Sequence, residues 1–80
     1  MASLETEGLD RSLLYSERCA RLSQALAELP YEQREVVVLK VKDGLKLRDL
    51  AKLQNVSIST VHGRYRYGMD KLRTLLNGEI

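Results

Sequence analysis

The stretch LRDLAKLQNVSISTVHGRYRY, residues 47–67, decides the fold of this chain. Its apolar residues Leu47, Leu50 and Ala51 fall at positions i, i+3 and i+4, the spacing that lets a short helix bury one face. Asn55 ends this helix, because Asn is second only to Gly in adopting the left-handed backbone conformation found at helix ends. The stretch therefore begins with a short amphipathic helix that stops at a tight turn.

A second helix is predicted directly after the turn. Ser57 offers a side-chain oxygen that can cap it. At 100° per residue, a face within about 80° of Val61 collects apolar and small residues, namely Tyr65, Gly68, Met69, Leu72, Leu75 and Leu76. Two helices joined by a tight turn form a helix-turn-helix, whose second helix lies in the major groove of DNA.

The opposite face of this second helix is polar and basic in its first turns. Ser59, Gly63, Arg66 and Asp70 lie near the centre of that face, with Thr60, His62 and Tyr67 on its flanks. Arg66 is the strongest single candidate for a DNA contact, because Arg to guanine or phosphate is the commonest pairing. Two alternatives stay open: His62 is merely exposed, and Tyr67 covers the apolar edge of the helix.

The composition favours an all-α domain. Trp and Phe are absent and Pro occurs once, while Leu, Ala, Glu, Lys and Arg are abundant. The 80 residues suffice for one domain with a small core. The net charge of +2 is unevenly distributed, with −3 over residues 1–35 and +5 over residues 36–80. The basic half contains the helix-turn-helix, as expected of a domain that binds nucleic acid.

The residue types argue against several functional classes. One His, one Cys and scattered carboxylates give no metal-ligand cluster, no nucleophile with a base and no phosphate loop, so neither an enzyme nor a cofactor is expected. Cys19 cannot form an internal disulfide, and no apolar run reaches the ~18 residues of a membrane span. Because the start also lacks a secretory signal, we expect a cytoplasmic location and no membrane partner.

The chain begins with a polar, acidic segment, residues 1–10, which we interpret as a flexible start or the remnant of a linker. From about Arg11 a first helix is predicted, with one continuous buried stripe formed by Tyr15, Cys19, Leu22, Leu26 and Leu29. On that stripe Cys19 is expected to be a small core residue. Pro30 ends the helix and suits the first turn of the next one.

Residues 36–50 allow two interpretations. VVVLKVK, then Asp43-Gly44, then LKLRDL also matches a β-hairpin with an Asp-Gly turn. A hairpin would, however, consume Leu47 and Leu50, which the helix of the downstream pattern needs. We therefore favour a helix over this hairpin.

That helix is predicted over residues 31–42, with Gly44 just past its end. A last helix is predicted from near Ile58 to a stop signal at Asn77-Gly78. The prediction is an all-α, four-helix domain over residues 11–80, with a helix-turn-helix in its C-terminal half and no sheet.

From Ala25 onward a series of short motifs follows in a fixed order. They are Leu29-Pro30, Arg34-Glu35-Val36, Gly44-Leu45, Asp49-Leu50-Ala51, Val56-Ser57, Thr60-Val61, Arg64 and Lys71-Leu72-Arg73. With these motifs the chain resembles region four of bacterial sigma factors, in particular those of the extracytoplasmic-function type. The resemblance covers more than half of the chain.

The resemblance implies two roles. In that family this domain reads the upstream promoter element, called minus 35, and docks on the flap of the RNA polymerase β subunit. By position in the motif, the residues that would face base edges are His62, Gly63, Arg66 and Tyr67. Those that would contact the DNA backbone are Ser59 and Thr60 at the helix N-terminus, and Lys46 and Arg48 before them. Arg64 would support the fold or touch phosphate. An anti-sigma factor is a further candidate partner, and the free domain is expected to be a monomer.

The chain departs from the family pattern in and around the first helix of the helix-turn-helix. Lys46 stands where the family often has a capping Ser, a loss of ~1 kcal/mol. Asp49 replaces a longer Glu, so its pairing with Arg64 across the two helices is expected to be weak. Gln54 and Asn55 replace the usual apolar residue and Gly before the turn.

Two further departures lie on the second helix of the motif. Gly63 supplies no side chain where Ser is common, and Tyr67 stands where Arg is usual. The preferred bases are therefore expected to differ or to be relaxed. The domain that melts promoter DNA is also missing from this sequence, so we expect either a fragment of a longer sigma factor or a free-standing relative.

Two alternative functions stay open. A LuxR-type regulator shares the Arg34-Glu35-Val36 and Thr60-Val61 pattern, although Leu29-Pro30 and Arg64 fit the sigma family better. A module that binds only polymerase or an anti-sigma factor is favoured by Gly63 and by the modest net charge. Binding of promoter DNA distinguishes this module from the sigma interpretation.

Overall fold

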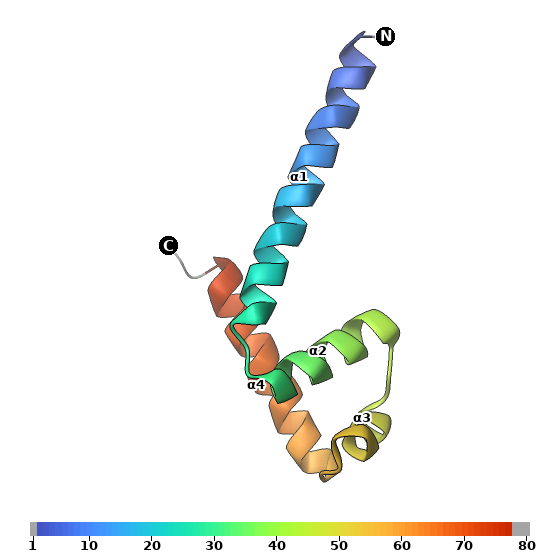
Figure 1. The fold of residues 1–80 in the computed structure, drawn as a ribbon, viewed down its shortest axis with the longest axis vertical. Coiled ribbons are helices and arrows are strands. Elements are labelled where there is room, and N and C mark those ends of the chain that lie inside the picture. Colours follow the sequence, from blue (N-terminus) through green and yellow to red (C-terminus); the bar gives the residue numbers. More distant parts are fainter. Residues whose placement is uncertain (1, 78–80) are drawn as a thin grey trace.

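The computed structural model describes residues 2–77, and the side chains of residues 13–77. Four helices follow one another, α1 (Ala2–Ala27), α2 (Tyr31–Asp43), α3 (Leu47–Gln54) and α4 (Ile58–Asn77), and the described residues contain no strand. The predicted all-α, four-helix class is confirmed. In Figure 1, α2, α3 and α4 form one packed group, whereas the N-terminal half of α1 projects away from it.

The successive valines of α2 are buried in two different core clusters, which a helix can serve. Val36 belongs to a core cluster with Leu50 and Val61, whereas Val37 belongs to a second cluster with Leu72. Adjacent positions on a helix point about 100° apart, so one helix serves both clusters. The β-hairpin alternative is therefore wrong.

The turns form where the sequence predicts them. Gly44 follows α2 with a φ of 70°, and its backbone N–H donates to the carbonyl of Leu39. Asn55 follows α3 with φ 57° and ψ 47°, and it is the only non-glycine residue with positive φ among the described residues. Both residues therefore end their helices in the left-handed conformation, which is the geometry expected from Gly and Asn.

The face of α4 predicted to be apolar is the face that packs. Val61, Gly68 and Leu72 are buried, and Tyr65 contacts both core clusters. Gly68 lies so close to α2 that a Cβ added to it would stand 2.7 Å from Cγ2 of Val37. The side chain of Val37 on α2 therefore packs directly against the backbone of α4 at Gly68.

Two parts of the prediction for the first helix are wrong. The helix begins at Ala2, well before the expected start near Arg11. Its stripe is buried only at the C-terminal end, where Leu26 is half-buried and Leu29, just past the helix, is 3 % exposed. The other members of the predicted stripe, Tyr15, Cys19 and Leu22, are exposed.

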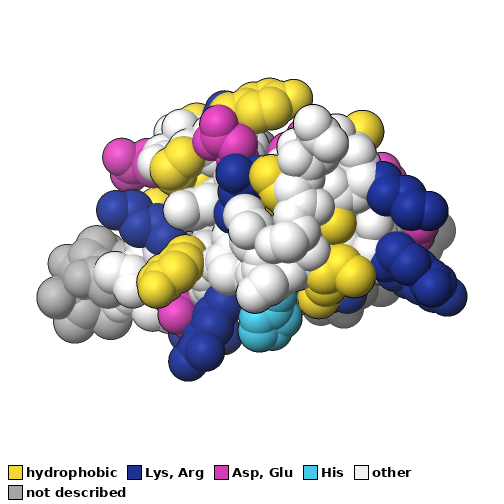
Figure 2. Space-filling view, turned by 90° about the horizontal axis from the view of Figure 1, so that it is seen from below, with side chains coloured by type: hydrophobic (Ala, Val, Ile, Leu, Met, Phe, Trp, Pro, Cys, Tyr) yellow, Lys and Arg dark blue, Asp and Glu magenta, His cyan; other side chains and the backbone are white. Residues whose placement is uncertain are grey.

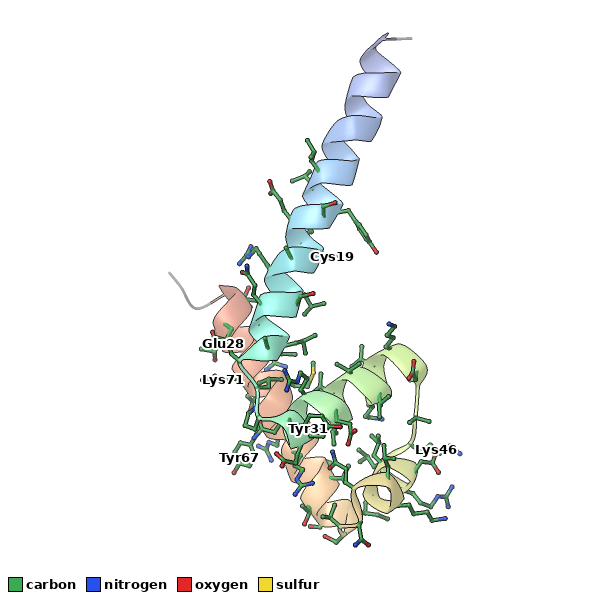
Figure 3. All side chains as sticks on the ribbon, viewed as in Figure 1. Cys19, Glu28, Tyr31, Lys46, Tyr67 and Lys71 are labelled. Atoms are coloured by element: carbon green, nitrogen blue, oxygen red, sulfur yellow. The ribbon has the colours of Figure 1, made fainter. Side chains whose placement is uncertain are left out.

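The physical reason is that only the last turns of α1 have helices to pack against. Figure 3 shows Cys19 on the part of α1 that extends beyond α2 and α4. There the spacing still aligns the apolar side chains, but no described residue covers them, so Cys19 is not a core residue. A hydrogen bond from Nη2 of Arg21 to the carbonyl oxygen of Leu76, 2.8 Å long, ties α1 to the end of α4.

No helix of the described residues is long and apolar enough to cross a membrane.

Candidate nucleic-acid interface

Helix α4 begins with a side-chain cap. Oγ of Ser57 accepts the backbone N–H of Thr60 at 3.1 Å and donates to Oγ1 of Thr60 at 2.9 Å. The first cap bond satisfies one of the backbone donors that have no partner within the helix. Ser59 and Thr60, the two residues predicted to meet the DNA backbone, are exposed at this positive end of the helix dipole.

The residues predicted to face base edges lie along the outer side of α4. His62, Arg66 and Tyr67 are exposed, and Tyr67 reaches 69 % exposure. Gly63 is half-buried, yet a Cβ added to it would meet nothing within 4 Å. The outer face of α4 is therefore open along its first three turns.

Figure 2 views the end of the molecule at which α3 and the start of α4 lie. The histidine, which is the single one in the sequence, stands at this surface with Lys and Arg side chains on both sides of it. A DNA groove is bordered by negatively charged phosphates. Cations on either side of a residue that faces the groove complement that charge.

Helix α3 adds exposed cations to this surface. Lys46, Arg48 and Lys52 are all exposed. Lys46 occupies the N-cap position of α3 in an extended conformation and makes no side-chain capping bond, as the sequence predicts. Its ammonium group is therefore not engaged in capping, and Figure 3 shows it at the start of α3.

Arg64, half-buried on the flank of α4, has a different partner from the one expected. Its Nη1 donates to Oε1 of Gln54 at 2.7 Å. The pairing with Asp49, which was expected to be weak, is replaced by this bond: Asp49 is exposed on α3, whereas Gln54, at the end of that helix, reaches the guanidinium.

Gln54 in turn joins α3 to the start of α2. Its Nε2 donates to the backbone carbonyl of Glu32 at 3.0 Å and to Oε1 of Glu35 at 2.9 Å. The other carboxylate oxygen of Glu35 accepts the hydroxyl of Tyr31 at 2.8 Å. These hydrogen bonds from Gln54 and Tyr31 lower the pKa of Glu35, because they stabilise its charged form.

Sequence reasoning noticed Gln54 only as a departure from the family pattern and missed this network. Its members come from α2, α3 and α4, so no spacing within one helix could reveal it. The available signal was a polar residue at a position where an apolar one is usual.

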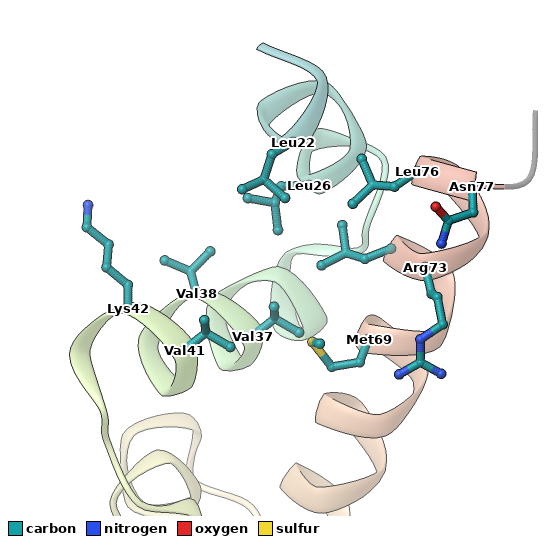
Figure 4. Close-up of a pocket in the computed structure, with 11 residues that line it drawn as sticks. Leu22, Leu26, Val37, Val38, Val41, Lys42, Met69, Arg73, Leu76 and Asn77 are labelled. Atoms are coloured by element: carbon teal, nitrogen blue, oxygen red, sulfur yellow. The ribbon is translucent and has the colours of Figure 1, made fainter. Parts of the chain in front are cut away.

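A second feature, also missed, is an apolar groove of about 560 Å³ near the C-terminal end of α4. It lies between three helices, with Leu22 and Leu26 of α1, Val38 and Val41 of α2, and Met69 and Leu76 of α4 on its walls (Figure 4). Lys42 and Arg73 also line it. The groove and the outer face of the first turns of α4 are thus separate surfaces.

The described residues contain no group of three or more His, Cys, Asp or Glu that could hold a metal ion. The surface around α4 carries the hydroxyl groups of Ser59 and Thr60, the imidazole of His62 and the guanidinium of Arg66. Such groups bind phosphates and base edges.

Comparison with known protein families decides the relationship. The family model described as Sigma-70, region 4, matches residues 19–72, which is more than half of the chain. The chain belongs to this family. The match favours the sigma interpretation over a LuxR-type regulator. Neither a curated protein nor a solved structure matches the chain significantly.

Membership places this sigma region 4 domain in transcription initiation. The family consists of DNA-binding domains that recognise promoters, act with RNA polymerase and are not enzymes. The matched segment contains α2 and α3 whole, together with α4 as far as Leu72. The surface around α3 and the start of α4 therefore lies entirely within the part that defines the family.

Proposed function

We propose that this domain reads the upstream, minus 35 promoter element with the outer face of α4 and docks on the β flap of RNA polymerase. The observation that carries the proposal is the capped, open and cation-flanked start of α4 within a sigma region 4 domain. A groove-reading helix needs base-facing side chains at its N-terminal end and cations beside them.

The predicted residues other than Arg64 take roles that their positions support. Arg66 and His62 reach base edges, with Tyr67 beside them, and Gly63 allows close approach of the helix backbone. Ser59 and Thr60 bind a phosphate at the helix N-terminus. Lys46 and Arg48 neutralise phosphates from α3, on the same end of the molecule.

The apolar groove supports the docking half of the proposal. Its walls come from α1, α2 and the last turns of α4, so it lies away from the DNA-reading turns. A partner helix with one apolar face suits such a groove, because its apolar side chains can fill it. Promoter and polymerase then bind one domain at the same time.

The same groove favours a second candidate function, a module that binds polymerase or an anti-sigma factor without reading DNA. Val41 at its wall is 63 % exposed, an apolar side chain that a partner would cover. The two candidates differ in whether the domain selects a DNA sequence.

Selection from randomised duplexes at low salt, followed by retesting at higher salt, separates them. Enrichment of a short motif supports promoter reading, because phosphate contacts alone enrich no sequence and weaken steeply with salt. Arg66→Ala should then weaken binding by ~1 to 3 kcal/mol and relax one position of the motif. Arg18→Ala, an exposed change on α1, is the matched control and should leave the motif unchanged. Enrichment of no motif favours the interaction module.

Docking is tested with a charge placed in the groove. Val41→Glu should abolish binding to the β flap and leave the selected duplex bound. Leu53→Glu alters an exposed apolar side chain of α3 outside the groove and should still bind the flap. Equal flap binding by both variants contradicts docking at this groove.

A further inference from the structure

A chain of four polar side chains crosses from α2 through α3 to α4. Tyr31 donates to Glu35, Gln54 donates to Glu35, and Arg64 donates to Gln54, over distances of 2.8, 2.9 and 2.7 Å. Its middle member, Gln54, is half-buried between the other two helices. Arg64 is therefore linked to α2 through a neutral amide.

The surroundings of Gln54 fix the direction of that amide. Its Nε2 has two acceptors on α2, the carbonyl oxygen of Glu32 and the carboxylate of Glu35. A rotated amide would turn its NH₂ group toward the guanidinium of Arg64 and its oxygen toward the carboxylate, and both contacts would be repulsive. Oε1 is thus held toward Arg64 as a fixed acceptor.

A neutral partner also preserves the charge of Arg64. A carboxylate in contact with the guanidinium would cancel its charge at that point of the surface. Gln54 instead stands between Arg64 and Glu35, and its amide accepts a hydrogen bond without neutralising the cation. A guanidinium has five N–H donors, and the contact with Gln54 uses one of them.

Arg64 lies on the side of α4 that we expect to face the DNA backbone. It lies four residues after Thr60, so the two side chains share one side of the helix. Thr60 is exposed at the helix N-terminus, where a phosphate is favoured. A DNA strand that contacts Thr60 is therefore within reach of Arg64, which lies about one helical turn further along the same side of α4.

We propose that Gln54 is a positioning residue that holds the guanidinium of Arg64, with its full charge, against a phosphate of the DNA bound by α4. The inference rests on the proposed DNA binding and deepens it. Holding the long side chain in advance reduces the conformational entropy that it loses on binding.

The test compares affinity and its salt dependence among four variants. Gln54→Met keeps the length of the side chain and removes its hydrogen bonds, and Arg64→Met removes the cation. Both single variants and the double variant should bind the selected duplex about tenfold more weakly, with a salt slope smaller by about one phosphate contact. Gln24→Met, on the exposed face of α1, should bind like the unaltered protein.

The double variant separates positioning from general support of the fold. If Gln54 acts through Arg64, removing both costs no more than removing Arg64 alone. A Gln54→Met protein with unaltered affinity and salt slope overturns the inference, as does a double variant whose losses simply add.

Thermal unfolding of each variant verifies that it is folded at the assay temperature. If Gln54→Met is not folded, Gln54→Asn replaces it, because its amide is neutral but too short to hold the guanidinium, so the same loss of affinity and drop in salt slope are expected.

The inference and the proposed function fail in different ways. If no motif is enriched, promoter reading fails, and the variants are measured on an unselected duplex, where the salt slope still reports the phosphate contact. A smaller slope for Gln54→Met then supports the positioning role, and an unchanged slope overturns it. A protein that binds no duplex at low salt refutes both.

Discussion

Replacing Gly68 by Ala tests the packing of α4 on α2. In the interior of an exposed helix this change stabilises a protein by about 1 kcal/mol, because Gly has a greater conformational entropy to lose. At Gly68 the added Cβ would lie 2.7 Å from Cγ2 of Val37 and 3.5 Å from Cβ of Gln33. Real Cβ atoms do not approach carbon atoms so closely, so α2 or α4 must shift.

The size of the effect follows from two opposed contributions. Overpacking of a close-packed core costs about 1 to 3 kcal/mol. Val37 cannot easily turn away, because a β-branched side chain in a helix has one strongly preferred rotamer. After the helical gain is subtracted, Gly68→Ala should lower the free energy of unfolding by about 1 kcal/mol, which corresponds to a fall in Tm of ~4 to 8 °C.

Gly63→Ala is the matched control, because it lies in the same helix and its Cβ would meet nothing within 4 Å. Thermal and urea unfolding should show it more stable than the unaltered protein by about 1 kcal/mol. In a Val37→Ala background, where Cγ2 is gone, Gly68→Ala should lose its destabilising effect. A Gly68→Ala protein as stable as Gly63→Ala would refute the close contact between α2 and α4.

Three further changes test the local structure. Ser57→Ala removes the cap of α4 and should cost about 1 kcal/mol in urea unfolding, whereas an unchanged midpoint contradicts the cap bond. Lys46→Ser supplies a missing cap to α3 and should raise stability by about 0.5 to 1 kcal/mol; no gain shows that the N-cap is placed elsewhere. The folded-state pKa of Glu35 is lowered from 4.5, so its contribution to stability is present above about pH 4.5 and is lost as the pH falls through the lowered pKa. Glu35→Gln should flatten the acid side of the stability curve; an acid side as steep as that of the unaltered protein contradicts the hydrogen bonds to Glu35.

Local signals in the sequence were sufficient for the helix ends. Gly44, Asn55 and Ser57 act through their own backbone conformation or through a residue three positions away. Such effects depend little on the rest of the fold, which explains why the predicted boundaries of α2, α3 and α4 agree closely with the structure.

The valine run was ambiguous because its periodicity cannot be interpreted without the fold. Val36 and Val37 face two different clusters, and Val38 faces the groove, so three successive positions are apolar. A helix was favoured over a hairpin only because a hairpin would have used Leu50, which the apolar face of the following helix requires. Leu50 is indeed fully buried against Val36.

The errors arose because the spacing of residues along one helix shows which side chains share a face. It does not show which other element packs against that face. The stripe of α1 aligns Tyr15 and Cys19 correctly, but no described helix packs against them. The partner of Arg64 was misassigned for a similar reason. The family resemblance suggested a weak pairing with Asp49, whereas the arrangement of three helices brings the amide of Gln54 to the guanidinium.

The central claim is that the outer face at the start of α4 contacts DNA, and backbone amide NMR with the selected duplex tests it most directly. We predict that the largest chemical-shift changes fall on residues 57–67 and on Lys46 and Arg48, and that the groove residues Val41 and Leu76 change little. Changes concentrated at the groove, with α4 unaltered between residues 57 and 67, would contradict the account.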